Sequence, residues 1–308
     1  FLRLCASKGI YLVLTDINNS SHRMEQWLEQ PTLFNAAKKF HKYLIINSKS
    51  TASDGFNTVR SFALGTWLAE LADNWGALTD AWVWYEKGTG KLFGTGPVQY
   101  SYEDTRKVFT FPETLFAMNM LQAYANGGTV FNAEHPFYCT GVNDKASWAL
   151  TESILPAMRY VIENPAATRE QVKEEIKAVY HTDTYIARNF AEGLYGNATD
   201  SNLLQMSGRY RVLPILPRNL TGEEAAQFGT VLRSGDLNNR VKILNGLYPD
   251  TVSTGNAYVE TLLGGKQGTG DRWLVMNSNE NKNENQTARI SLSNSFASAV
   301  ALDLTAHT

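Results

Sequence analysis

The sequence predicts an α/β protein: the C-terminal half of a (β/α)8 TIM barrel followed by an all-β, sandwich-like domain. The first observation is that short apolar strands ending in polar residues alternate with helical stretches over the first half of the 308-residue chain. Continuous apolar strands of this kind are typical of a parallel sheet covered on both faces. The second observation is a series of short strands separated by polar turns after about residue 255. We expect the barrel part to span residues 1–220 and the β-rich, incomplete domain residues 221–308.

Four strand–helix units carry the pattern, which makes roughly half of a (β/α)8 barrel. A doubly wound sheet explains the alternation equally well, and the polar strand ends favour the barrel, because barrel enzymes gather their active sites at the carboxyl ends of their strands. The predicted strands are 10–16, 43–47, 81–86 and 128–134, and the predicted helices that follow them include 61–75, 112–127 and 145–165. The residues that end these strands are Asp16, Asn47 with Lys49, Glu86, and Glu134 with His135.

The sequence pattern changes after Pro165, where the alternation of apolar strands and helices gives way to other segments. Residues 168–180 read as a charged amphipathic helix with Thr168 as its N-cap, and 210–217 reads as one further strand between prolines. The strands of the β-rich tail fall at AYVETLLGG, DRWLVMNSNEN, TARISLS and ASAVALDLTAHT.

The composition excludes several classes of function. A net charge of −2 gives no electrostatic footprint for nucleic acid, and no apolar run approaches the roughly 20 residues that span a bilayer. No phosphate-binding loop, HExxH pair or CxxC motif is present, so we expect neither a cofactor nor a metal. The two cysteines, Cys5 and Cys139, are too few for a disulfide framework.

Carboxylates at strand ends favour glycoside hydrolysis, because that reaction needs one carboxyl group to protonate the leaving oxygen and another to activate water or attack the sugar. Glu134 at the end of the fourth strand is the first candidate. Its partner is Glu86 or Asp80, at opposite ends of the segment 80–86. Strand-end topology prefers Glu86, since Asp80 would begin the predicted strand. The expected substrate-binding residues are Trp82, Trp84, Asn132, His135, Tyr138, Asp16, Asn47 and Lys49, the two tryptophans as a flat platform for a sugar ring.

The stretch from Phe62 to Pro217 resembles glycoside hydrolase family 98 in the order and spacing of four segments. The resemblance implies a catalytic barrel joined to a β-sandwich, and an inverting, endo-acting hydrolase that cuts β-galactosidic linkages of blood-group glycans or, in other members, xylan. It also implies that Glu134 is the glutamate of an Asp–Glu pair that holds the attacking water; residue identity then prefers Asp80 over Glu86. The segments are SFALGTWLAELADNWG, DAWVWYE, YANGGTVFNAEHPFYCTG and GRYRVLPILP.

The general acid of such an enzyme has no good counterpart in this sequence, and the resemblance places it before Phe1. We therefore expect a companion N-terminal fragment to complete the barrel, and an oligosaccharide or polysaccharide as substrate. Secretion or display at the cell surface is the expected location. The alternatives are an endo-xylanase of the same family and a carbohydrate-binding protein without catalysis.

Overall fold

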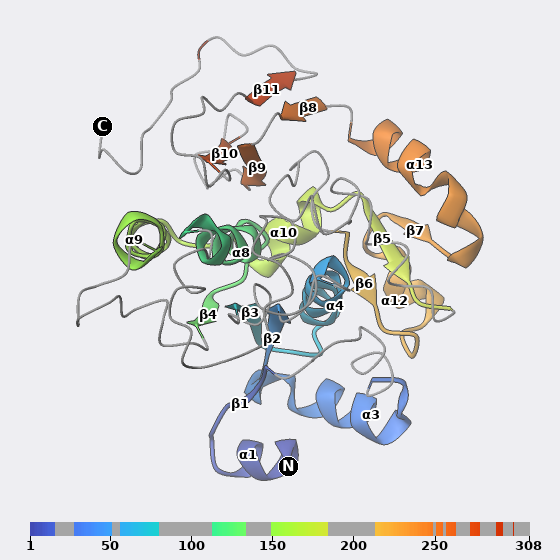
Figure 1. The fold of residues 1–308 in the computed structure, drawn as a ribbon. Helices are drawn as coiled ribbons and strands as arrows, with labels where there is room; N and C mark the ends of the chain where they lie inside the picture. The colour runs from blue at the N-terminus through green and yellow to red at the C-terminus, as the bar shows by residue number, and fades with distance from the viewer. Residues whose placement is uncertain are drawn as a thin grey trace, which may run out of the picture.

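The computed structural model describes residues 1–15, 28–50, 56–79, 113–133, 149–183 and 213–248, four short stretches at 251–254, 257–262, 272–277 and 288–291, and residue 298. Its architecture is two parallel sheets with helices packed between and around them (Figure 1). The α-helices are α1 (Leu2–Ser7), α3 (Pro31–Phe40), α4 (Phe56–Leu68), α8 (Glu113–Ala125), α9 (Leu155–Glu163), α10 (Arg169–Glu175), α12 (Gly222–Ala226) and α13 (Arg240–Leu247). Shorter turns of 3-10 helix lie at His41–Tyr43 and Ser234–Asn239, and a π-helix at Ala149–Ile154 leads into α9.

The first sheet has four parallel strands in the order β1-β2-β3-β4, as the sequence predicted for the first half of the chain. Each strand enters the sheet beside the one before it, with helices in the connections, which is the arrangement that βα units produce. The strands are β1 (Leu12–Leu14), β2 (Leu44–Ser50), β3 (Asn74–Thr79) and β4 (Val130–Ala133).

One face of this sheet is packed into the core. Leu44, Ile46, Trp75 and Ala77 alternate along the two central strands and are buried with residues of α4 and α8 in one hydrophobic cluster. Trp75 is fully buried, and its indole Nε1 donates to the carbonyl oxygen of Asn126 at 3.1 Å. The opposite face is the one whose side chains remain partly exposed, at Val13, Ile45, Lys49 and Asn132.

The third strand lies earlier in the chain than the sequence predicted. The strand between β2 and β4 is Asn74–Thr79, whereas the sequence favoured 81–86, a segment outside the described residues. Residues 74–75 belong to this strand and not to the predicted helix 61–75, because α4 ends at Leu68 and Glu70 turns the chain with a left-handed φ of 58°. The small, glycine-containing segment NWGALT carries a weaker apolar signal than AWVWYE, and this misled the prediction.

The second sheet has three parallel strands in the order β6-β5-β7. They are β5 (Ala178–His181), β6 (Ile215–Leu216) and β7 (Thr230–Leu232). Thr168 caps α10 as predicted, in a reciprocal capping box with Gln171. The helix does not continue to residue 180, however. It stops at Glu175, and the short run Ala178–His181 becomes a wholly buried strand, a case that periodicity alone cannot separate from a helix end.

Helix α4 lies between the two sheets (Figure 1). It packs on β2 and β3 of the first sheet and on β6 of the second. Gly65 in the last turn of α4 makes the second contact so close that a Cβ there would overlap the carbonyl of Ile215. Among the described elements, α4 contacts both sheets, and buried residues of both sheets belong to one hydrophobic cluster.

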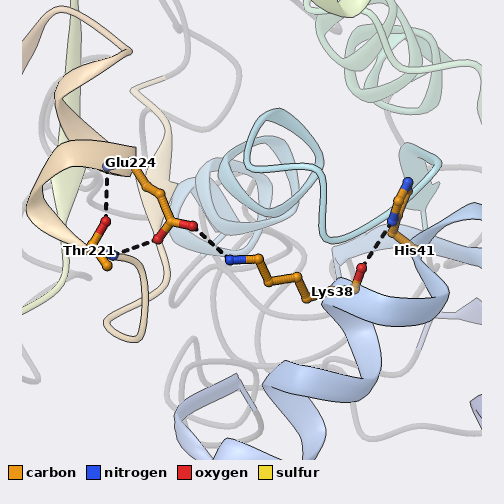
Figure 2. Close-up of polar contacts among 4 residues, drawn as sticks. All are labelled: Lys38, His41, Thr221 and Glu224. Atoms are coloured by element: carbon orange, nitrogen blue, oxygen red, sulfur yellow. Dashed lines mark hydrogen bonds and ion pairs between the residues drawn. The ribbon is translucent and has the colours of Figure 1, made fainter.

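Polar contacts also join the segments on either side of residue 168. Figure 2 shows Lys38 of α3, whose Nζ lies 2.7 Å from Oε1 of Glu224, while Glu224 and Thr221 cap the start of α12 reciprocally. Asn219 Nδ2 donates to the carbonyl oxygens of Leu28 and Glu29 at 2.6 and 2.9 Å. On another side, Arg169 donates to the carbonyl oxygens of Ala72 and Asp73 and stacks over Trp67.

The C-terminal strands form two antiparallel pairs, β9 with β10 and β8 with β11. Three of the four strands lie inside segments that the sequence predicted as strands, and β8 was not predicted. The last predicted strand, ASAVALDLTAHT, is outside the described residues except for residue 298. The sandwich and the domain boundary near residue 220 stay predictions. The strands are β8 (Thr251–Thr254), β9 (Ala257–Leu262), β10 (Arg272–Asn277) and β11 (Ala288–Ser291).

Candidate active site

Three strands of the first sheet end at the same register position, at the carboxyl edge of the sheet. In the register of the sheet Ser50 pairs with Thr79, and Thr79 pairs with Ala133. Strands β2, β3 and β4 therefore end side by side, and neighbouring strands lie only about 4.8 Å apart. In open and closed parallel sheets alike, this edge is where ligands and catalytic groups gather.

Three predicted binding residues lie on the partly exposed face of the sheet, within the last four residues of their strands. Asn47 and Lys49 alternate along β2, and Lys49 pairs through Leu78 with Asn132 of β4. Partners in a parallel ladder project to the same side, so Lys49, Leu78 and Asn132 form one row across the sheet. Lys49 is half-buried and Asn132 is exposed. The structure thus brings together the three predicted site residues that it describes.

Asn47 lies on the same face of β2 as Lys49, two residues before it. It is only 1% exposed, and no hydrogen bond reaches its Oδ1. Its neighbour Ser48, on the other face of β2, donates instead to the carbonyl oxygen of Gly76 at 3.0 Å. A buried amide oxygen without a donor is costly unless water or a ligand supplies one. A binding role for Asn47 stays a prediction, and its amide oxygen is the atom that would accept a hydrogen bond from a ligand.

The carboxylates and aromatics of the predicted site lie outside the described residues, so their geometry stays a prediction. Two of them are nevertheless tied to described strand ends by the chain itself. Asp80 directly follows Thr79 and Glu134 directly follows Ala133, the two residues that pair at the edge. The described strand β3 precedes Asp80 in the chain, and the expectation that Asp80 begins its strand stays a prediction, because Asp80 lies outside the described residues. The residues outside the described part are Asp16, Asp80, Trp82, Trp84, Glu86, Glu134, His135 and Tyr138.

Sequence reasoning missed one charged residue behind the sheet. Arg60 of α4 is 2% exposed, and its Nη2 donates to Oδ1 of Asn119 on α8 at 2.8 Å. Buried guanidinium groups are rare and need compensation. The signal was available, since Arg60 is the one charged residue in the apolar helix FNTVRSFALGTWL.

The carboxyl edge of the second sheet has a different chemistry. Asp183, just beyond β5, accepts hydrogen bonds from the amide and hydroxyl of Ser234 and from the hydroxyl of Tyr180, at 3.0–3.2 Å. Burial raises the pKa of Asp183, but these hydrogen bonds outweigh it and hold the pKa below its ordinary value. For His181 beside it, burial first and then the charge of Arg233 lower the pKa. Asp183 therefore serves the fold by fixing the turn after β7.

Comparison with protein families identifies the class of protein. The model of glycosyl hydrolase family 98 matches residues 1–167, and the model of the C-terminal domain of that family matches residues 169–308. The two matches cover all but one residue of the chain. The chain therefore belongs to glycosyl hydrolase family 98.

Individual relatives narrow the comparison. The chain is 29% identical over 298 residues to the blood-group-substance endo-1,4-beta-galactosidase of Clostridium perfringens. It is also similar to crystal structures of the catalytic module of a family 98 glycoside hydrolase from Streptococcus pneumoniae TIGR4. The native form gives a TM-score of 0.76 at 32% identity over 93% of this chain. A complex with the H-disaccharide blood group antigen gives 0.75 at 30% identity over 93% of this chain, and one with the LewisY pentasaccharide blood group antigen gives 0.75 at 30% identity over 94%.

The match in length is partial. The chain spans 35% of the Clostridium protein and 50% of the chain in the native Streptococcus structure, and 51% of the chain in each complex. The structural likeness supports an α/β fold in which the first sheet is a curled parallel half-barrel, consistent with part of a TIM barrel. Within the described part of the chain, no helix combines the length and apolar character needed to cross a membrane.

Proposed function

We propose that this chain supplies the water-activating part of the active site of an endo-acting, inverting glycoside hydrolase that cleaves β-galactosidic linkages in blood-group glycans. The observation that carries the proposal is the pairing of Thr79 with Ala133 at the carboxyl edge of the first sheet. The next residue along each strand is a carboxylate, Asp80 after Thr79 and Glu134 after Ala133. Family membership supplies the reaction class, and the names of the relatives supply the class of substrate.

The partner of Glu134 is then Asp80 and not Glu86. Leu78 pairs with Asn132 on the partly exposed face, and Asp80 and Glu134 are two residues beyond them. Alternation in a regular strand returns a side chain to the same face every second residue. Both carboxylates are therefore proposed to face the open side of the sheet, where Asn47, Lys49 and Asn132 already lie.

In the proposed reaction, the carboxylate pair takes a proton from water, and the water oxygen attacks the anomeric carbon from the face opposite the leaving group. The bond from that carbon to the glycosidic oxygen breaks as a general acid protonates the oxygen. In inverting enzymes the acid and base stand about 6.5–9.5 Å apart, which leaves room for the water. Asn47, with its unsatisfied amide oxygen, is proposed to accept a hydrogen bond from a sugar hydroxyl.

We propose that the general acid comes from a companion segment that completes the barrel against β1. Two observations support this. The chain spans half of the chain in the native Streptococcus structure, and the residues along the β1 edge are exposed although apolar. Ile10, Tyr11 and Val13 are 57%, 53% and 43% exposed. An open, apolar strand edge invites pairing with another strand. A secreted or cell-surface location, where such glycans occur, is part of the same proposal, as is the C-terminal β-sandwich.

The test uses the full-length protein that carries this chain. Glu134→Gln and Asp80→Asn each lower kcat on H-type blood-group oligosaccharides by about 10²–10⁴-fold, the usual contribution of a general base. Binding of the same oligosaccharide to both variants is retained in calorimetry. Glu70→Gln is the matched control, since Glu70 is an exposed acid paired with Lys173 at 3.0 Å, outside the site. Unaltered turnover by Glu134→Gln shows that the site is misassigned.

Two further measurements separate the alternatives. Proton NMR of the fresh product shows the α anomer at the new reducing end if a β linkage is cleaved with inversion. A panel of blood-group oligosaccharides, galactans and xylan distinguishes the galactosidase from an endo-xylanase of the same family. Binding without turnover of any of them by the wild-type protein supports the non-catalytic alternative.

A further inference from the structure

Lys49 is the one ionisable side chain in the four described strands of the first sheet. The strands read LVL, LIINSKS, NWGALT and VFNA, and every other residue in them is apolar or an uncharged polar residue. A strand position in a parallel sheet usually holds an apolar side chain, because both faces of such a sheet are covered. Burying a lysine there costs free energy unless its charge is paired or hydrogen-bonded.

The position of Lys49 is set by the ladder. It lies one residue before the end of β2, half-buried, in the row that runs through Leu78 to Asn132. Neither β1 nor β3, the strands on each side of β2, contributes a charged residue. The elements packed behind the sheet add Arg60 on α4, itself a cation, and Glu113, the first residue of α8. These two are the charged residues of α4 and α8, the described helices packed behind the sheet.

The sequence supplies the complementary charge just past the other strands. Asp80 follows β3 and Glu134 follows β4 directly, and Asp16 lies two residues after β1. Asp80 is two residues beyond Leu78, the partner of Lys49. Two residues of an ordinary strand advance about 6.6 Å, a distance comparable with the length of a lysine side chain. Several carboxylates at one sheet edge repel each other, and a cation among them favours their ionised forms.

We propose that Lys49 is a positioning residue that keeps the water-activating carboxylate pair of Asp80 and Glu134 ionised and oriented. The inference rests on the proposed function and assigns to Lys49 a task other than binding the sugar. Lys49 keeps its proton throughout the reaction. The proton lost by the attacking water goes to the carboxylate pair, and the ammonium group stabilises the charge that this pair carries beforehand.

The experiment is a pH profile of kcat/KM for the full-length protein on a blood-group oligosaccharide. In Lys49→Met the pKa of the water-activating pair rises, because the neighbouring positive charge is gone. The base is then protonated at higher pH, and the acid limb of the profile moves up by about one pH unit. Lys49→Arg keeps the charge and leaves the limb near its wild-type position. Lys42→Met, at an exposed lysine before β2, is the matched control and leaves the profile unchanged.

The outcomes are distinct. An acid limb that does not move in Lys49→Met overturns the inference, and a raised KM with an unmoved limb shows that Lys49 binds substrate instead. If Lys49→Met does not fold, judged by its melting temperature against Lys42→Met, Lys49→Gln retains a polar chain and gives the same readout. The proposed function is tested separately: full activity in Glu134→Gln overturns it, whereas an inactive Glu134→Gln with an unmoved Lys49→Met profile overturns only the role of Lys49.

Discussion

The two parallel sheets of this chain differ in the hydrogen bonding of Asp183, just beyond the second sheet, and of Asn47 in the first. At the second sheet, the carboxylate of Asp183 is held by three donor groups, two from Ser234 and one from Tyr180. At the first sheet, Asn47 is almost fully buried, yet its Oδ1 accepts no hydrogen bond. His181 and Thr182, buried beside Asp183, are exceptions at the second edge because their side chains also lack partners. The comparison of Asp183 with Asn47 teaches that an acid after a strand is not by itself a site, because donors of the protein itself can already occupy its carboxylate.

The largest expected effect comes from the helix that both sheets share. Gly65→Ala forces a methyl group against the backbone carbonyl of Ile215, where neither α4 nor β6 has a flexible side chain to move aside. We expect a loss of about 3 kcal/mol or more in the free energy of unfolding, at the upper end for overpacked cores. Urea unfolding followed by circular dichroism measures it.

The matched control for Gly65 is Gly222 at the start of α12. A Cβ at Gly222 meets nothing within 4 Å, and its backbone is not left-handed. Gly222→Ala should be neutral or stabilising by up to about 1 kcal/mol. A Gly65→Ala protein as stable as wild type would show that the sheets are not packed as closely on α4 as the structure has them.

An intermediate effect is expected at the second sheet. Asp183→Asn replaces an acceptor of three hydrogen bonds with a group that also donates, and we expect a loss of about 1–3 kcal/mol in the free energy of unfolding near neutral pH. Because the pKa of Asp183 is lowered on folding, its stabilisation is present above the ordinary aspartate value of 3.8 and is lost as the pH falls below it towards the folded value. The difference between wild type and variant therefore shrinks at acid pH.

Unfolding titrations at several pH values from neutral down to about 2.5 check this pH dependence. Asp73→Asn serves as the control, since Asp73 is exposed and close to the first sheet. If Asp183→Asn is neutral in stability but impairs sugar binding, the second edge is a binding site and the contrast between the two sheets fails.

The smallest effect is expected at the surface contact that Figure 2 shows between α3 and α12. Lys38→Met removes the ion pair with Glu224 but leaves the cap that Glu224 forms with Thr221. The side chains are 57% and 32% exposed, so the change should cost less than about 1 kcal/mol and should vanish in high salt. Thermal unfolding at low and high ionic strength measures it, and a loss that persists in high salt would mean that the contact acts through packing.

The sequence predicts the architecture of the first half well because its signals are strong. Three of the four strands fall where apolar runs end in polar residues, and α8 follows from the helical stretch 112–127. The third strand was misplaced because NWGALT is held in the sheet by its two neighbouring strands and not by its own apolar content. Likewise, Ala178–His181 forms a strand because it pairs with β6 on one side and β7 on the other. No local sequence pattern reveals these pairings.

For the candidate site, the sequence named residues, and the described strands place three of them on the first sheet. Asn47, Lys49 and Asn132 were found from strand ends and alternation, and the register brings them to one face. The place of Asp80 relative to its strand stays a prediction, because the residues after Thr79 lie outside the described part of the chain. Arg60 was overlooked although it is the one charged residue of α4, because it lies just before the predicted helix 61–75.

The position of α4 between the sheets has a consequence for how such proteins can be recombined. The two family models meet at Thr168, and Thr168 is the residue that caps α10. A chimera that exchanges the sequence after this point between family members inherits one half of each contact that crosses it. The donor segment must offer a backbone that fits against Gly65, a carboxylate for Lys38, an amide for the carbonyls of Leu28 and Glu29, and an arginine for the turn at Ala72. The junction that divides the family into two sequence modules is therefore a poor place to cut the molecule, and viable exchanges will be those that carry the matching partners with them.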